Sequence, residues 1–194
     1  MESWRDYAGA IATALAHLAA TGPDGAELDA EKAFGRWVQL THEISQAGNS
    51  VFIVGNGGSA MIASHFATDA CKNGRLRAMA FNDAAMLTAA ANDLAFAEVF
   101  AVPLAQIGRA GDLLITISSS GNSPNVIRAI EVAQAARMQV VTLSGKTSDN
   151  RSRAMGDLNF YIPADRYGWV ESAHHIVMHH WLDQYLNTYG RGAL

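Results

Sequence analysis

The stretch Val51-Phe52-Ile53-Val54-Gly55-Asn56-Gly57-Gly58-Ser59-Ala60 decides the fold of this chain. Its four apolar residues indicate a buried strand, and the glycines that follow allow a sharp turn into a helix. Glycine also lets backbone N–H groups come close to an anion, and a helix N-terminus favours negative charge. We therefore predict a strand, an anion-binding loop and a helix in this order.

The same loop also fits a dinucleotide-binding pattern. Residues Gly55 to Ala60 match G-x-G-x-x-A, and Asp83 lies beyond the next predicted strand, where an acid that binds ribose is expected. The pattern is short, and a purely structural turn can produce it as well. A second loop is needed to choose between these readings.

That second loop is Ser118-Ser119-Ser120-Gly121-Asn122-Ser123-Pro124, which ends another strand and again enters a helix. Pro124 suits the first turn of that helix, where the missing N–H costs little. One serine is enough to cap a helix, whereas four hydroxyls favour a clamp for phosphate oxygens. Two such loops argue against the dinucleotide reading, so we expect no nucleotide cofactor.

Short apolar runs alternate with helical segments from residue 50 onward. We predict strands at 51–54, 77–81, 112–117, 139–143 and 159–162, and helices at 59–72, 84–91, 94–107, 123–136 and 169–187. This alternation predicts an α/β fold, a three-layer doubly wound sandwich with a five-stranded parallel sheet. Ligands of such sheets bind outside the carboxyl ends of the strands.

Two amphipathic segments, 3–20 and 26–46, precede the first strand and predict an N-terminal helical pair. We expect one domain over 1–194, with a helical hairpin at 1–48 and an α/β core at 50–190. Residues 191–194 are expected to form a frayed end. The hairpin is not needed for binding a phosphate, so we expect it to cover the domain or contact a partner subunit.

Composition excludes several classes of function. The chain has 194 residues, 49% hydrophobic and only 16% charged, which indicates a globular protein with surface buried between subunits. A net charge of −4 without a dense basic run argues against nucleic acid as a partner. The chain lacks a signal-peptide pattern and a membrane-spanning apolar run, and its single cysteine, Cys71, suits a reducing compartment. We therefore expect a cytoplasmic protein without a membrane partner.

Five of the seven histidines fall in two places, His65 and the group His174, His175, His179 and His180. His65 and Asp69 are four residues apart and share a helix face, while Glu171 and His179 are two helical turns apart. Imidazole and carboxylate together suit zinc and similar divalent ions. Histidines on a buried helix also serve packing and hydrogen bonding, and at least two of the four clustered ones must face elsewhere.

These motifs resemble the sugar isomerase (SIS) domain family and, within it, the phosphoheptose isomerases. The resemblance rests on residues 55–59, His65-Phe66-Ala67, Asn92-Asp93, residues 118–125 and the helix over 170–180, with similar spacing across nearly the whole chain. It implies a flavodoxin-like SIS fold and an enzyme of carbohydrate metabolism and heptose biosynthesis. The implied reaction converts sedoheptulose 7-phosphate to D-glycero-D-manno-heptose 7-phosphate through an enediol. It also implies a homotetramer with sites at the subunit interfaces.

The resemblance assigns roles to individual residues. The phosphate would be held by Ser118, Ser119, Ser120 and Ser123, and the sugar by Asn56, Gly57, Gly58, Ser59, Asp69, Asn92, Asp93 and Glu171. One Zn²⁺ per subunit would be bound by His65, Asp69, Glu171 and His179. Asp69 would act as the base and His179 would move the second proton, whereas His174, His175 and His180 are assigned to packing or subunit contacts.

Two positions depart from the family pattern. Asp69 stands where the family usually has glutamate, and Glu171 stands where it usually has glutamine. The shorter Asp69 reaches less far toward a substrate proton, and proton transfer needs hydrogen-bond distance. Glu171 supplies a second carboxylate that can strengthen metal binding or act as the base. The choice between the two acids stays open at this point.

A non-catalytic SIS module is the alternative function. Such a module would bind a sugar phosphate or a protein partner, as relatives linked to replication initiation and transcriptional control do. It needs the phosphate loops but has no use for acids and histidines that converge on them. The joint presence of Asp69, Glu171 and His179 therefore favours an enzyme.

Overall fold

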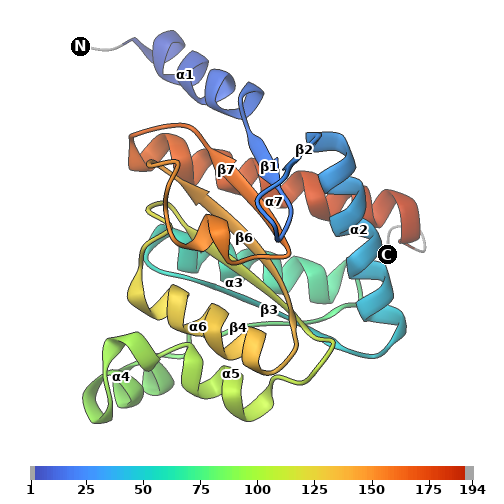
Figure 1. The fold of residues 1–194 in the computed structure, drawn as a ribbon, viewed down its shortest axis with the longest axis vertical. Coiled ribbons are helices and arrows are strands. Elements are labelled where there is room, and N and C mark those ends of the chain that lie inside the picture. The colour runs from blue at the N-terminus through green and yellow to red at the C-terminus, as the bar shows by residue number, and fades with distance from the viewer. Residues whose placement is uncertain (1–2, 191–194) are drawn as a thin grey trace.

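The computed structural model describes residues 3–190, and the prediction for residues 191–194 lies outside this range. The described chain folds into one mixed sheet with helices on both faces (Figure 1). The strands are β1 (Ala19–Thr21), β2 (Glu27–Leu28), β3 (Ser50–Gly55), β4 (Arg77–Ala80), β5 (Leu113–Ser118), β6 (Gln139–Gly145) and β7 (Leu158–Ile162). The helices are α1 (Trp4–Ala16), α2 (Ala30–Gln46), α3 (Gly58–Lys72), α4 (Ala84–Asp93), α5 (Ala101–Ile107), α6 (Pro124–Ala135) and α7 (Tyr167–Tyr189), with short 3₁₀ turns η1 (Phe96–Glu98) and η2 (Ser152–Ala154).

The sheet confirms the predicted parallel, doubly wound core and adds two strands to it. The strand order is β2-β1-β7-β6-β5-β3-β4, in which β3 to β7 are parallel, while β1 is antiparallel to β7 and to β2. The five parallel strands alone follow the flavodoxin-like order 2-1-3-4-5. The expected five-stranded sheet is therefore a seven-stranded one.

Successive side chains of β3 point to opposite faces of the sheet and belong to two separate hydrophobic cores. Val51 and Ile53 of β3 point toward α2, α3 and α7, whereas Phe52 and Val54 point toward α4, α5 and α6. This is the period of two that a strand imposes when both of its faces are covered. Two helical layers around one sheet give the three-layer sandwich.

The predicted N-terminal helical pair is present, but the first helix is shorter than predicted. Helix α1 ends at Ala16 instead of residue 20, and the chain then forms the β1–β2 hairpin before α2 begins. Both helices pack on α7. Another prediction was also too long: residues 94–107 divide into η1 and α5 and are not one helix.

The long helix α7 is fixed against α2 by a buried aromatic contact. The rings of Trp37 and Trp181 stack with centroids 4.9 Å apart, and Trp181 Nε1 donates to Thr41 Oγ1 at 2.9 Å. Thr41 in turn donates to the carbonyl oxygen of Trp37 at 2.8 Å. This contact sets the rotation of α7 about its axis and hence the direction in which its histidines point.

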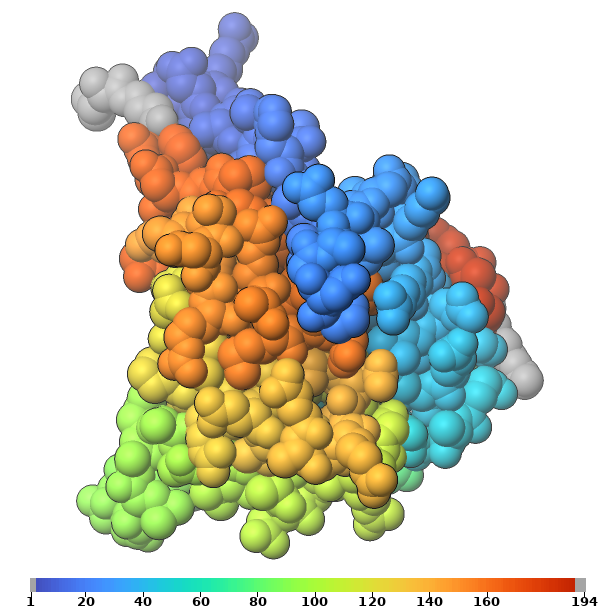
Figure 2. Space-filling view, viewed as in Figure 1, coloured from blue at the N-terminus to red at the C-terminus, as the bar shows by residue number. Residues whose placement is uncertain are grey.

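The surface shows which segments extend from the body. In the space-filling view, α1 projects at one end and α4 at the opposite end (Figure 2). No helix in the described part of the chain is both long and apolar enough to cross a membrane.

Candidate active site

The two predicted loops meet at one edge of the sheet. They follow β3 and β5, which are neighbours even though β4 lies between them in sequence. The strand order reverses at this point, and open α/β sheets bind ligands there. A cavity of about 200 Å³ lies between the loops and is lined by Asn56, Ser59, Ile117, Ser118, Ser119, Ser120, Ser123, Tyr167 and Glu171.

The serine loop does not merely cap a helix. Ser123 occupies the N-cap position of α6, yet its side chain makes no capping hydrogen bond, and its Oγ lies 3.4 Å from Ser118 Oγ. Ser118 Oγ accepts a hydrogen bond from the backbone N–H of Gly121, which turns the loop at a φ of 63°. The hydroxyls are therefore gathered around the cavity at the N-terminus of α6, where an anion is favoured.

A pair of amides joins the glycine loop to the serine loop. Asn56 Nδ2 donates to Asn125 Oδ1 at 2.9 Å, and Asn125 Nδ2 donates to Asn56 Oδ1 at 2.8 Å. Asn56 precedes α3 and Asn125 lies in the first turn of α6. The pair thus holds two helix N-termini side by side.

Glu171 extends from α7 onto the start of α3. A Cβ atom at Gly58 would lie 2.7 Å from Glu171 Oε2, so the carboxylate occupies the space that a side chain at position 58 would need. Negative charge is stabilised at a helix N-terminus. Glu171 lines the serine cavity and also a second cavity of about 360 Å³, which is lined by Gly58, Met61, Ile62, His65, Glu171, Ser172 and His175.

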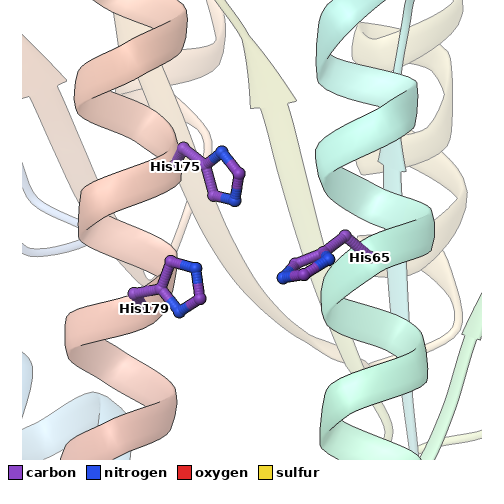
Figure 3. Close-up of side chains that lie close together, drawn as sticks. All are labelled: His65, His175 and His179. Carbon is purple, nitrogen blue, oxygen red and sulfur yellow. The ribbon is translucent and has the colours of Figure 1, made fainter.

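Three histidines meet between α3 and α7, as Figure 3 shows. His65 points from α3 toward His175 and His179, which lie one turn apart on α7. One nitrogen of each ring lies within 4.8 Å of one nitrogen of the others. Neutral imidazoles suit zinc and its neighbours, so this donor set fits the divalent ion that the family resemblance implies.

The two carboxylates of the predicted metal set lie in different places. Asp69 Oδ2 is 3.3 Å from His65 Nε2, and Asp69 lines neither of the two cavities described above. Glu171 lines both cavities. Of the four predicted ligands, the structure therefore places Glu171 in both cavities, His65 in the second cavity and His179 in the cluster beside His65, and it leaves Asp69 on the flank of His65.

Asn92 and Asp93 are not brought to this site within one chain. They lie at the end of α4, where Asn92 Nδ2 donates to Asp93 Oδ1 at 2.8 Å, and both are exposed. Neither residue lines the serine cavity or the cavity beside His65. The predicted sugar contacts from these two residues are therefore not made by the chain to which they belong.

The other histidines of α7 have separate environments. His174 is fully buried, its Nε2 lies 3.1 Å from the carbonyl oxygen of Ser144, and burial lowers its pKa to about 4. His180 packs edge-on against Phe34. Both therefore serve packing, whereas His175, which sequence reasoning assigned to packing, lies in the cluster. Burial and the nearby His179 and His65 lower the pKa of His175 from its ordinary value.

Sequence reasoning also missed three residues near the phosphate cavity. Tyr167 lines the cavity, and Lys146 Nζ lies 4.0 Å from the centre of its ring, which brings a positive charge next to this tyrosine. Asn125 supports the cavity through Asn56. Lys146 directly follows β6, which ends two residues later than the predicted strand 139–143, and this position points to the ligand edge of the sheet. The pairing of Asn125 with Asn56 has no signal in the sequence.

Cavity size alone does not locate the site. A larger cavity of about 650 Å³ lies beside α1 and is lined by Ala10, Thr13, Ala14, His17, Lys146, Tyr161, Pro163, Ala164, Asp165 and Trp169. It contains none of the loop serines and none of the clustered histidines. The chemistry of the lining therefore favours the two smaller cavities that share Glu171.

Comparison with known proteins supplies the family. Residues 26–145, more than half of the chain, match the family model of the SIS domain. The chain belongs to the SIS-domain family. This SIS-domain chain is 36% identical over 148 residues to the phosphoheptose isomerase of Thiobacillus denitrificans, a match that covers 72% of this chain and 75% of that relative.

Solved structures agree with this membership. The phosphoheptose isomerase of Neisseria gonorrhoeae has a TM-score of 0.74 and 34% identity, covering 79% of this chain and 86% of its own. A phosphoheptose isomerase from Francisella tularensis has a TM-score of 0.82 and 26% identity, covering 95% of this chain and 96% of its own. The resemblance seen in the sequence is confirmed, and this SIS-domain chain groups with the phosphoheptose isomerases.

Proposed function

We propose that this chain catalyses aldose–ketose isomerisation of a sugar phosphate, converting sedoheptulose 7-phosphate to D-glycero-D-manno-heptose 7-phosphate through an enediol. One observation carries the proposal: Glu171 lines both the serine cavity and the cavity beside His65 and His175. A site for phosphate and a site with acid–base groups therefore adjoin. The phosphoheptose isomerases to which the chain is similar support the choice of substrate.

The serine cavity would bind the phosphate. Four hydroxyls, from Ser118, Ser119, Ser120 and Ser123, line it beside the N-terminus of α6. Charge-assisted hydrogen bonds to phosphate oxygens are stronger than neutral ones, and the helix N-terminus adds a favourable field. With the phosphate held there, the rest of the sugar extends past Glu171 toward the histidines, alongside Asn56, Gly57, Gly58 and Ser59.

Isomerisation needs a base to remove the proton from the carbon next to the carbonyl. The family resemblance assigned Asp69 to this step and left Glu171 as the alternative, and the placement of Glu171 in both cavities favours Glu171. The enediol then collapses when a proton is returned to the neighbouring carbon, a transfer that we assign to His179. Histidine suits this role because its ordinary pKa lies near neutrality.

A divalent cation, zinc by family resemblance, would be held by the clustered histidines. When bound, it would act as a Lewis acid that polarises the carbonyl and hydroxyl oxygens of the sugar. We also place the reaction in the cytoplasm, where the exposed thiol of Cys71 stays reduced.

We further propose a homotetramer in which a neighbouring subunit completes each site. Such an assembly brings the histidines of one subunit close to Asn92-Asp93 of another, and large apolar side chains are exposed at both places. Met61 and Ile176 lie beside the histidines, and Leu94 and Phe96 lie just after Asn92-Asp93. Exposed apolar groups of this size favour burial against another chain. Asn92 and Asp93 of one subunit would then contact the sugar bound by its neighbour.

The direct test is turnover of sedoheptulose 7-phosphate by the purified chain, with and without added zinc. Formation of the heptose 7-phosphate is expected, and its absence under both conditions would contradict the substrate assignment. Proton exchange from D₂O at the carbon next to the carbonyl separates an enzyme from a binding module, because a module binds the sugar phosphate without exchange.

The base is tested with two isosteric variants. Glu171→Gln is expected to lower kcat by at least about 100-fold, the usual scale for loss of a general base. Asp69→Asn is expected to lower it less, and the surface variant Glu131→Gln on α6 serves as the control. A larger loss in Asp69→Asn than in Glu171→Gln would return the base to Asp69.

A further inference from the structure

We propose that one divalent transition-metal ion is held by the three histidines His65, His175 and His179, with Asp69 bound to His65 and not to the metal. This ligand set differs from the one that the sequence resemblance implies, which contains Asp69 and Glu171 and omits His175. The proposal rests on the function proposed above for its catalytic meaning, but metal binding itself is measured without substrate.

The geometry is that of one histidine on α3 facing a pair of histidines on α7. His175 and His179 are four residues apart, so their rings lie on one face of α7, with centroids 5.1 Å apart. The ring of His65 lies across from both, with centroids at 5.4 Å and 5.5 Å. All three rings point into the space between α3 and α7 (Figure 3).

The ring nitrogens need only small movements to bind an ion. One nitrogen of each ring lies within 4.8 Å of those of the other two. Zinc binds imidazole nitrogen at about 2.0–2.1 Å, and tetrahedral angles then place the nitrogens roughly 3.4 Å apart. Side-chain rotations that move each nitrogen by about 1 Å are sufficient, because these rings lie at the surface of α3 and α7 and not in the core.

Asp69 is placed to orient His65. Its Oδ2 lies 3.3 Å from His65 Nε2, so the carboxylate faces this nitrogen, and we assign the other nitrogen, Nδ1, to the ion. A carboxylate behind a metal-binding histidine is a common arrangement that fixes the tautomer and makes the ring more basic. Asp69 thus has a use at the metal site that does not require direct contact with the ion.

This ligand set keeps the proposed base, Glu171, apart from the metal. Three neutral histidines leave the full charge of a divalent ion available, whereas two carboxylate ligands would cancel it. They also leave a fourth coordination position open, as catalytic zinc sites do. Glu171 lines the same cavity as His65 and His175 and stays available as the base.

The test is metal binding to the full chain after treatment with chelator and dialysis. Zn²⁺ is titrated calorimetrically, and Co²⁺ is titrated by visible absorption, whose ligand-field bands report the donors. We expect one ion per chain. His65→Gln, His175→Gln and His179→Gln are each expected to weaken Zn²⁺ binding by more than about 100-fold, and Asp69→Asn by about 10–100-fold, the range for an outer-shell partner.

Two variants on α7 serve as controls, Glu171→Gln and His180→Gln, and both are expected to bind Zn²⁺ within a few-fold of the unaltered chain. Thermal unfolding in chelator shows whether each variant is folded. The proposal is overturned if His175→Gln binds Zn²⁺ as tightly as the unaltered chain, or if Glu171→Gln loses as much affinity as His65→Gln. Absence of Zn²⁺ binding by the unaltered chain also overturns it.

Failure of this proposal is distinguishable from failure of the proposed function. Turnover of sedoheptulose 7-phosphate by a chain that binds no metal refutes the metal site and leaves the isomerase. Tight Zn²⁺ binding that depends on His175, in a chain without turnover, refutes the isomerase and leaves the metal site.

Discussion

At the scale of single residues, Glu171 owes its position to a neighbour that has no side chain. Gly58 opens α3, and the Glu171 carboxylate occupies the space that a Cβ at position 58 would fill. The carboxylate is the flexible end of a side chain, so it can move away if that space is taken. If Glu171 is the base, as we propose, glycine at 58 serves the chemistry more than the stability of the fold.

Gly58→Ala is thus expected to impair activity without unfolding the protein. Alanine favours a helix by roughly 0.5–1 kcal/mol over glycine, so stability stays level or rises, while kcat falls because Glu171 is displaced. Urea unfolding and turnover are measured together. Gly35→Ala in α2, where a Cβ meets nothing within 4 Å, is the control and should leave turnover unchanged. Full activity of Gly58→Ala would contradict a catalytic role for Glu171 in its observed position.

The buried ring of His174 predicts a loss of stability in acid. Burial lowers its pKa from 6.5 to about 4, so the unfolded chain takes up a proton at a higher pH than the folded chain. The neutral ring makes its full contribution to the free energy of unfolding above pH 6.5. As the pH falls from there toward 4, the free energy of unfolding drops by about 3 kcal/mol in all. Urea unfolding across this range, with chelator present, should show a shallower pH dependence for His174→Gln. An unchanged dependence would contradict the assignment.

The adjacent residues His174 and His175 also show a limit of sequence reasoning. Successive helix positions point about 100° apart, so one of the two can face the sheet and the other α3. Which does so depends on the rotation of α7, which the contact between Trp37 and Trp181 sets. That contact joins residues far apart in sequence, so helical periodicity could not show that His175 belongs with His65.

At the scale of elements, sequence patterns predicted those helices and strands that are determined by residues close together in the chain. The strand–loop–helix units around Gly55 and Ser118 follow from apolar runs and turn residues, and both were predicted within a few residues. The strands β1 and β2 were not predicted, because Ala19 and Ala20 continue the helical pattern of the segment 3–20, and residues 27–28 fall within the predicted helix 26–46. Their extended form is stabilised by pairing with β7, about 140 residues away, and by Asn159, whose Nδ2 donates to the carbonyl oxygens of Thr21 and Gly22.

The packing of α7 on α2 includes one buried hydroxyl, that of Thr41, beside the stacked tryptophans. Thr41→Val removes the acceptor of Trp181 Nε1 while keeping the volume of the side chain. A buried donor without a partner costs about 1–3 kcal/mol, and we expect a loss of stability in that range. Urea unfolding measures it, and Thr68→Val on the exposed side of α3 is the matched control, expected to change stability by less than about 0.5 kcal/mol. Equal effects of the two variants would contradict this role for Thr41.

At the scale of the whole molecule, the low proportion of charged residues agrees with the proposal that another chain covers part of the surface. Exposed apolar side chains lie near the histidines and beyond α4, and α1 and α4 project from opposite ends of the body (Figure 2). The 16% of charged residues indicated buried interfaces, but composition could not locate them. The exposed fractions of individual side chains are the basis on which we propose where they lie.

Phe96→Asp tests the proposed assembly. Phe96 is 60% exposed in the single chain, so the variant should fold, yet a charge there opposes burial against a neighbour. Light scattering after size exclusion is expected to show species smaller than a tetramer, with turnover reduced in parallel. Ile107→Asp at the end of α5, where the side chain is 44% exposed, is the control. A Phe96→Asp tetramer with full turnover would contradict the proposed interface.

The reciprocal amide pair of Asn56 and Asn125 limits how this site can change. Each side chain supplies both the donor and the acceptor that the other needs. Replacing Asn125 removes both amide partners of Asn56, and replacing Asn56 leaves Asn125 Nδ2 without its acceptor, although Asn125 Oδ1 still accepts from the N–H of Val126. Single substitutions at these positions should therefore be selected against. Variation is expected to proceed through paired replacements that restore the match. The sequences of relatives can therefore be searched for concerted changes at positions 56 and 125. Libraries that redesign the pocket should randomise the two codons together.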